Sequence, residues 1–198
     1  DGIWQLYTEL GGMVRSSGPG SADNTQALVK AVIGMHEDLN LLQFHEAVHA
    51  VAGALARPGE AGDGKSPQAA PVDVATSFYR AVQDCPTRVP APQMAAMAAA
   101  LTDAMLEHAG PRGRDAANNE HLDALLAVAP NLIPRQRMAA VMGLCSAQAR
   151  RNGGRTPQAL KALKSALDTR RRKVEELAGP ELGVALADAF SKGLLLAL

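Results

Sequence analysis

Two histidines and a glutamate form the segment His45-Glu46-Ala47-Val48-His49, whose residue types and spacing could bind a metal ion and cleave a peptide bond. On a helix, positions i and i+4 share one face, so both imidazoles can hold the same zinc ion. Glu46 lies between them and can act as general base on a zinc-bound water. The pattern therefore predicts a zinc site with His45 and His49 as ligands and Glu46 as the catalytic base.

The residues around this pattern, Phe44 to Ala50, resemble the zinc helix of the FtsH-type metallopeptidases, although that family has glycine at the position of Val48. The resemblance implies a largely helical peptidase domain and a distant acidic third ligand. The acidic candidates in this chain are Asp115, Glu120 and Asp123, and Glu120 is the first choice.

The same histidines also suit a helix that binds no metal. A helical wheel places His45 and His49 on the flank of an apolar stripe and Glu46 further round, and the stripe consists of Leu41, Phe44, Val48, Val51 and Leu55. Zinc peptidases usually offer an edge strand to the substrate, and no strand is visible here. Flank positions suit a groove or a solvated face equally, so both interpretations stay open.

The chain contains three further histidines, His36, His108 and His121. His36 could approach the same region if the helices before and after it form a hairpin. His108 and His121 are expected at helix ends, without a role in a site.

The elements that must position these residues are expected to be helices. The chain has 198 residues, of which 47% are apolar and only 3% aromatic, so its core must consist of Ala, Leu, Val and Met, a composition that favours helix over sheet. Twenty cationic and 20 acidic side chains cancel, which excludes a global attraction to nucleic acid or anionic membranes. Cys85 and Cys145 form neither a disulfide framework nor a thiolate zinc site. No run of 18 apolar residues predicts a membrane span.

Glycine and proline clusters divide the chain into helical segments. The pattern of apolar residues predicts helices at 3–14, 23–35, 41–56, 72–83, 92–108, 116–128, 135–151, 157–177 and 180–196. A break is expected at Gly110–Gly113. The fold class is therefore expected to be all-α, in a single domain over residues 1–198.

Internal repetition predicts how these helices are arranged. Residues 81–97 align without gaps on 125–141 at an offset of 44, and the matching pairs are Pro86 and Pro130, Val89 and Ile133, Pro90 and Pro134, Met94 and Met138, and Ala95-Ala96 and Ala139-Ala140. A period of this size is typical of stacked antiparallel helix hairpins. The expected units are 23–56, 72–108, 116–151 and 157–196, with an N-terminal capping helix at 3–14.

This array resembles the HEAT/armadillo class of helical-repeat proteins over residues 23–196. It is loosely similar to the helical-repeat type III effectors of plant-pathogenic bacteria, although their SKWP tetrapeptide is absent. The resemblance implies a protein-protein interaction scaffold without a cofactor, cytoplasmic or secreted into a host cell. The apolar end from Gly193 to Leu198 further suggests a fragment of a longer chain.

A basic stretch at 150–173 carries nine Lys and Arg against Asp168, and four of these cations are consecutive: Arg170, Arg171, Arg172 and Lys173. Such a stretch is either a solvated helix face or a contact for an acidic partner or phosphates. No aromatic residues are interleaved with the cations, so nucleic acid could be held there only through its phosphates. The leading hypothesis is a protein-binding helical-repeat scaffold, and the alternative is a zinc metallopeptidase at residues 45–49.

Overall fold

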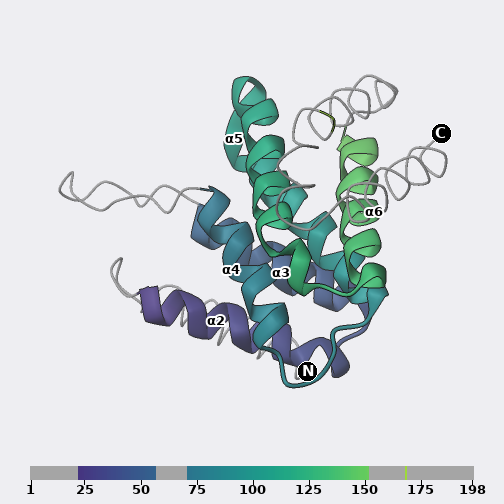
Figure 1. Ribbon diagram of the computed structural model, residues 1–198. Helices are drawn as coiled ribbons and strands as arrows, with labels where there is room; N and C mark the ends of the chain where they lie inside the picture. Colours follow the sequence, from purple (N-terminus) through teal and green to yellow (C-terminus); the bar gives the residue numbers. More distant parts are fainter. Residues whose placement is uncertain (1–21, 57–70, 152–167, 169–198) are drawn as a thin grey trace.

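Residues 22–56 and 71–151 fold into helices, as shown in Figure 1. The computed structural model describes residues 22–56, 71–151 and 168. The helical elements are α2 (Ala22–Gly34), the 3-10 turn η1 (Met35–Glu37), α3 (Leu41–Ala56), α4 (Pro71–Asp84), α5 (Ala91–Val128), the 3-10 turn η2 (Ala129–Asn131) and α6 (Pro134–Arg151). No strand occurs in these ranges, which confirms the expected all-α class. The helices predicted at 3–14, 157–177 and 180–196 lie outside the described residues, apart from Asp168, which is helical.

Four predicted helices are confirmed with their ends shifted by at most one residue, namely those at 23–35, 41–56, 72–83 and 135–151. The fifth element, α5, differs from the prediction, because helical backbone continues through the expected break at Gly110–Gly113. None of the described helices is both long enough and apolar enough to cross a lipid bilayer.

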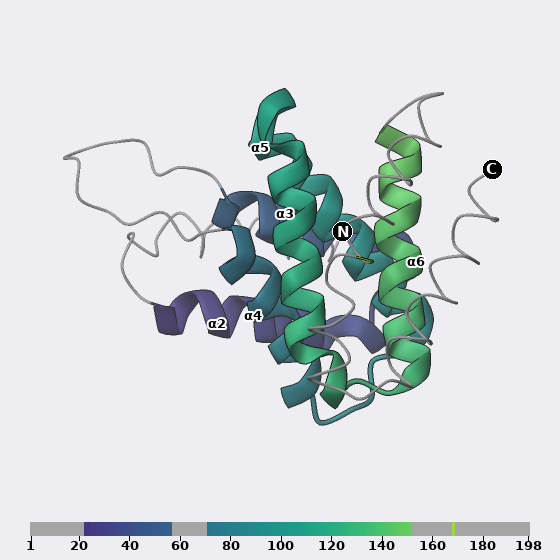
Figure 2. The ribbon, with the colours of Figure 1, turned by 45° about the horizontal axis from the view of Figure 1, so that its top comes forward.

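Although α5 is one helical element, it does not run straight. Thr102 Oγ1 and His121 Nδ1 lie 3.1 Å apart, whereas residues with this separation along a straight helix would be about 28 Å apart. The chain therefore reverses between them, and in Figure 2 the α5 ribbon rises to a tip and returns. Gly110, Pro111 and Gly113 lie in this interval, and such residues bend helices. The chain thus changes direction in this interval, but through helical backbone and not through the predicted break.

The core lies around α5, which contacts α3, α4 and α6, while α2 packs against α4 and α3. Alanine, valine, leucine and methionine make up most of the buried side chains, as the composition predicts. The largest fully buried side chains include Tyr79, Phe44 and Phe78. With few aromatic residues available, close packing depends on how near the helices approach one another.

Small residues bring α5 and α6 into backbone contact. A Cβ atom added to Gly143 would lie 2.8 Å from the carbonyl carbon and 2.9 Å from the Cα of Ala95, and closer still to the carbonyl oxygen. Carbon atoms that are not bonded need about 3.5 Å or more. Only glycine fits at this crossing as it stands.

A glutamine occupies the third position of α3, α5 and α6: Gln43, Gln93 and Gln136. In α3 the Gln43 Oε1 accepts the Asn40 N–H at 3.1 Å, and the Asn40 Oδ1 accepts the Gln43 N–H at 3.0 Å, which is a capping box. In α6 the Gln136 Oε1 accepts the Ile133 N–H at 3.3 Å. The same side chain therefore completes the first turn of two of these helices.

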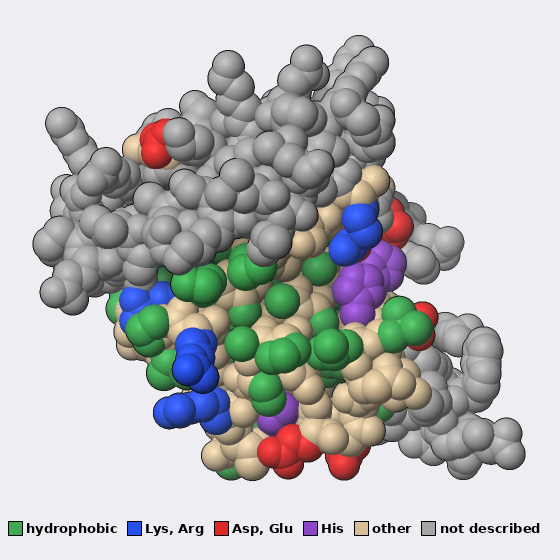
Figure 3. Space-filling model, turned by 90° about the vertical axis from the view of Figure 1, so that its right-hand side faces the viewer, with side chains coloured by type: hydrophobic (Ala, Val, Ile, Leu, Met, Phe, Trp, Pro, Cys, Tyr) green, Lys and Arg blue, Asp and Glu red, His purple; other side chains and the backbone are tan. Residues whose placement is uncertain are grey.

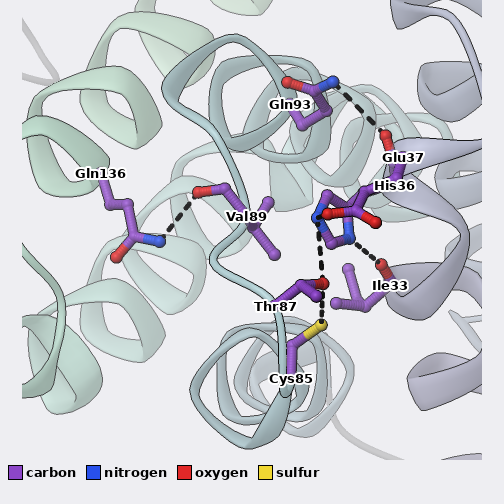
Figure 4. Close-up of polar contacts among 8 residues, drawn as sticks. All are labelled: Ile33, His36, Glu37, Cys85, Thr87, Val89, Gln93 and Gln136. Atoms are coloured by element: carbon purple, nitrogen blue, oxygen red, sulfur yellow. Dashed lines mark hydrogen bonds and ion pairs between the residues drawn. The ribbon is translucent and has the colours of Figure 1, made fainter.

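Two of the glutamines also bond the start of their own helix to a connection earlier in the chain (Figure 4). Gln93 Nε2 donates to the carbonyl oxygen of His36 at 3.4 Å, and Gln136 Nε2 donates to that of Val89 at 2.9 Å. The glutamines of α5 and α6 are 43 residues apart, one fewer than the offset of the sequence alignment. These bonds join the start of α5 to the turn after α2, and the start of α6 to the connection between α4 and α5.

Candidate functional site

The residues of the predicted zinc motif lie on α3, whose apolar stripe packs against α5. Phe44, Val48 and Val51 are buried, as expected. Leu41, which was predicted to belong to the same stripe, is exposed because it is the first residue of α3 and its side chain is not covered there. His45 and His49 flank the stripe, where they keep 27% and 32% of their side-chain surface exposed.

Two carboxylates of α5 face these histidines. Asp103 and Glu107 are four residues apart, as are His45 and His49, so two helices in contact can pair them in register. The Nε2 of His45 is 3.5 Å from the Oδ2 of Asp103, and the Nε2 of His49 is 3.2 Å from the Oε2 of Glu107. The histidine pair is therefore matched by a pair of acids on the neighbouring helix.

A cation from α6 completes the cluster. The Nη2 of Arg150 donates to the Oδ2 of Asp103 at 3.0 Å. The Asp103 side chain is 13% exposed, so the ion pair with Arg150 is partly shielded from water, unlike an ordinary surface pair. Asp103 thus links α5 to α6 and also lies beside His45 of α3.

These side chains line an open groove of about 600 Å³, called here the histidine groove. It is formed by Leu42, His45, Glu46, His49, Asp103, Glu107 and Arg150. Figure 3 shows histidine side chains beside cationic and acidic ones at one side of the molecular face. Among the described residues that line it, three carry carboxylates and one carries a guanidinium group.

The two imidazoles are not arranged to share one metal ion. A zinc ion bound to an imidazole nitrogen lies near the plane of the ring, 2.0–2.1 Å from the nitrogen. The rings of His45 and His49 are stacked with centroids 6.3 Å apart and planes only 9° from parallel. In this stacked arrangement, one ion bonded to both rings would lie outside the plane of at least one of them. Within the described ranges, no three His, Cys, Asp or Glu side chains are grouped to hold a metal.

The acidic ligand candidates do not reach the histidine groove. Neither Glu120 nor Asp123 lines it, and the side chain of Asp115 lies outside the described residues. Glu120 belongs to the second half of α5, which is held against α4 by the contact between His121 and Tyr79. The zinc centre expected from His45, His49 and Glu120 therefore does not fit this arrangement of side chains.

His36, which the sequence suggested could approach this region if its flanking helices form a hairpin, does not line the histidine groove. Its buried imidazole donates from Nδ1 to the Ile33 carbonyl oxygen at 2.9 Å, and its Nε2 is 3.5 Å from the Thr87 Oγ1 (Figure 4). The Oγ1 of Thr87 in turn lies 3.8 Å from the Sγ of Cys85. His36 thus connects the turn after α2 to the connection between α4 and α5.

His121 is buried in the core, whereas the sequence suggested a helix end. The hydroxyl of Thr102 donates to the Ala98 carbonyl at 2.8 Å, so its oxygen can only accept from His121 Nδ1–H. The His121 Nε2 is then unprotonated and accepts the Tyr79 O–H at 2.8 Å. Burial lowers the pKa of His121 to about 4 and raises that of Tyr79, so both side chains stay neutral at pH 7. This network joins α4 to both halves of α5.

The basic segment predicted at 150–173 is only partly described. Arg150 forms an ion pair with Asp103. The described residues do not include the four consecutive cations Arg170, Arg171, Arg172 and Lys173.

Sequence reasoning missed the residues that face the histidines. Asp103 and Glu107 share one face of a predicted helix at the same four-residue spacing as His45 and His49, and this matched spacing was the available signal. Arg150 carried no comparable signal.

Comparison of the chain with protein-family models, with curated proteins and with solved structures finds no match. The histidine groove and the exposed residues beside it therefore carry the functional argument.

Proposed function

We propose that this chain is a helical-repeat scaffold that binds a protein partner on the face formed by α3, α5 and α6. The expected units at 23–56, 72–108 and 116–151 each contain a helix, a short connection and a second helix. The third-position glutamines and their bonds to the preceding connection support a repeated unit, because each unit contacts its neighbour in a similar way. The proposal extends to a fourth unit at 157–196 and a capping helix at 3–14.

The observation that carries the binding proposal is a pair of exposed leucines. Leu41 and Leu42 are 47% and 66% exposed, and they are the large apolar side chains left exposed in the part of the chain that the structure describes. Leu42 also lines the histidine groove. Adjacent exposed apolar side chains beside a polar groove are typical of a protein contact, in which an apolar centre is surrounded by charged residues.

Affinity purification with matched variants tests this proposal. The chain, a Leu41→Ser/Leu42→Ser variant and an Ala50→Ser control are immobilised and exposed to the same lysate. Ala50 is also exposed on α3, so the control keeps the helix and alters another part of its surface. Burial of a leucine contributes about 1.5–3 kcal/mol, so loss of two should reduce retention of the partner at least about tenfold.

The expected result is a set of proteins retained by the chain and by the Ala50→Ser control but lost from the leucine variant. Circular dichroism must show equal helix content in all three. Identical protein sets from all three chains would contradict the proposal.

A second candidate function is that of a zinc metallopeptidase, favoured by the opening of His45 and His49 into one groove that also contains carboxylates. It requires one imidazole ring to rotate from the stacked arrangement. It also requires a third ligand other than Glu120, and Asp103 and Glu107 are the nearest acids in the groove.

Calorimetric titration of metal-stripped chain with zinc tests this candidate. One tight site lost in His49→Ala, together with zinc-dependent peptide hydrolysis lost in Glu46→Gln, would favour it. No zinc binding, or binding unaffected by His49→Ala, would remove it.

A further inference from the structure

We infer that the start of α6 and the connection before α5 bind an acidic segment of the partner, with one carboxylate on Arg137 and further carboxylates on Arg88 and Arg135. The inference rests on the proposed protein-binding function and adds the chemistry of the partner.

The three arginines are neighbours because α6 begins beside the connection between α4 and α5. Gln136 Nε2 donates to the Val89 carbonyl oxygen at 2.9 Å, as Figure 4 shows. Arg88 precedes Val89 in the chain. Arg135 and Arg137 flank Gln136. Consecutive Cα atoms are about 3.8 Å apart, so the backbone of each arginine lies one residue from this hydrogen bond.

The guanidinium of Arg137 is held in place with two donor groups left over. Its Nε donates to the Leu132 carbonyl oxygen at 2.6 Å. Its Nη1 and Nη2 form no hydrogen bond with the described residues. Two such groups side by side match the two oxygens of one carboxylate. Arg137 is therefore the expected anchor of an acidic ligand.

None of the three arginines has an acidic partner among the residues that the structure describes. The Lys and Arg side chains that form ion pairs in this part of the chain are Lys30 and Arg150. Asp84, at the end of α4, pairs with Lys30 at 2.8 Å, and Glu37 lies 3.8 Å from the Nε2 of His36. Three unneutralised cations at one place attract an anionic ligand.

The first turn of α6 carries the charge that a helix start disfavours. Arg135 and Arg137 are the second and fourth residues of α6, and its first turn contains no acid. The N-terminus of a helix has a partial positive charge, so cations are unfavourable there and anions are favourable. Partial burial also lowers the pKa of Arg137, because its charge is less well hydrated than that of an exposed arginine. A bound carboxylate would offset both effects.

The position of the arginines fits the proposed binding face. Leu41 and Leu42 are the first residues of α3. The start of α5 bonds to the turn ahead of α3 through Gln93 and the His36 carbonyl, and the start of α6 bonds in the same way to the connection ahead of α5. The starts of α3, α5 and α6 thus follow one another, so one partner can contact the leucines of α3 and the arginines of α6.

An acidic protein segment fits these residues better than nucleic acid does. Three arginines can pair with the side chains of a short segment, whereas a protein bound to duplex DNA contacts about 6–10 phosphates. The charges of the whole chain also cancel, so no general attraction to a polyanion is expected.

Fluorescence anisotropy with labelled peptides tests the inference. The probe is a serine-based peptide with three glutamates and an uncharged dye, and matched peptides carry glutamine or lysine at the same positions. The glutamate peptide should bind, with an affinity that falls as salt is raised. The other two peptides should not bind. Equal affinity for the glutamate and glutamine peptides would overturn the inference, as would tighter binding of a single-stranded oligonucleotide of equal charge.

Variants of the exposed arginines locate the contact. Arg88→Gln and Arg135→Gln should each weaken binding of the glutamate peptide about twofold to fivefold, the usual range for exposed charge pairs. Arg80→Gln removes an exposed cation from α4, so it is the matched control and should bind as the unmodified chain does. Unchanged binding in the Arg88→Gln/Arg135→Gln double variant, or an equal loss in the control, would contradict the inference.

Two substitutions test Arg137 as the anchor. Arg137→Gln should weaken binding at least about tenfold, because it removes hydrogen bonds between charged groups. Arg137→Lys keeps the charge but not the paired donors, so it should regain only part of the affinity. Full affinity in either variant would refute the paired contact. Thermal melts show whether loss of the bond to Leu132 unfolds them, and in that case the double variant of the exposed arginines decides.

Two further outcomes distinguish this inference from the proposed function. If the glutamate peptide does not bind but retention of a protein still depends on Leu41 and Leu42, the acidic segment is wrong and the binding function stands. If the peptide binds through the arginines but the leucine variant retains the same proteins, the leucine contact is wrong and the arginine site stands.

Discussion

Replacement of Gly143 by alanine tests the contact between α5 and α6. The added Cβ atom would lie 2.8 Å from the carbonyl carbon of Ala95, whereas about 3.5 Å or more is needed, so the helices must separate by at least about 0.7 Å. Such overpacking costs about 1–3 kcal/mol. Alanine regains up to about 1 kcal/mol through its higher helix propensity. The expected net effect is a decrease of between about 0 and 3 kcal/mol in the free energy of unfolding, and of about 1.5 kcal/mol at the midpoints of these ranges.

Gly34→Ala is the matched control. Gly34 has helical dihedral angles of −60° and −27°, and an added Cβ there would meet nothing within 4 Å. The same substitution should therefore raise the free energy of unfolding by about 0.4–1 kcal/mol, chiefly by restricting the unfolded chain.

Urea denaturation followed by circular dichroism measures both variants. The midpoints should move in opposite directions while the slopes with urea concentration stay equal. If Gly143→Ala is as stable as Gly34→Ala, α6 does not approach the Ala95 backbone as closely as described, and the packing argument fails.

Three further predictions concern the buried polar contacts. Burial lowers the pKa of His121 from its ordinary value of 6.5 to about 4. Between pH 6.5 and pH 4, His121 is therefore protonated in the unfolded chain but neutral in the folded chain. The free energy of unfolding should fall by about 3 kcal/mol as pH decreases from 6.5 to 4, as measured by urea melts at several pH values. A His121→Gln variant whose free energy of unfolding falls as steeply with pH would contradict this. Tyr79→Phe removes the donor to His121 Nε2 and should cost about 1–3 kcal/mol, so an unchanged melting temperature would be inconsistent with the hydrogen bond. Gln136→Ala removes the bond to the Val89 carbonyl and should cost about 1–2 kcal/mol in urea melts, whereas Gln83→Ala, which removes a longer bond to the Val128 carbonyl, should cost less.

Helix positions could be predicted because their signals are local. Proline near the start of α5 and of α6, and the apolar periodicity of α3, depend on neighbouring residues alone, so the ends of α3 agree with prediction. The break predicted at Gly110–Gly113 rests on the same kind of signal, and it lies in the interval in which α5 reverses. The helical backbone of this segment could not be predicted, because glycine and proline do not indicate whether a turn is open or helical.

The candidate site could be predicted only in part. The spacing of His45 and His49 places them on one side of α3, and the structure agrees. Glu120 does not line the histidine groove, and nothing in a sequence tells which face of a distant helix will be nearest. Asp103 and Glu107 took that place when α5 packed against α3.

The sequence by itself determined that the chain is helical, where most helices begin and end, and which side chains α3 presents beside its apolar stripe. These features follow from backbone preferences and from periodicity within one segment. Only the tertiary structure decided that Asp103, Glu107 and Arg150 meet the histidines, that the imidazoles stack, and that His121 is buried. The contacts between helices join residues far apart in the chain, such as Tyr79 and His121 at 42 residues and Asp103 and Arg150 at 47, and small residues such as Gly143 set the distance between the helices.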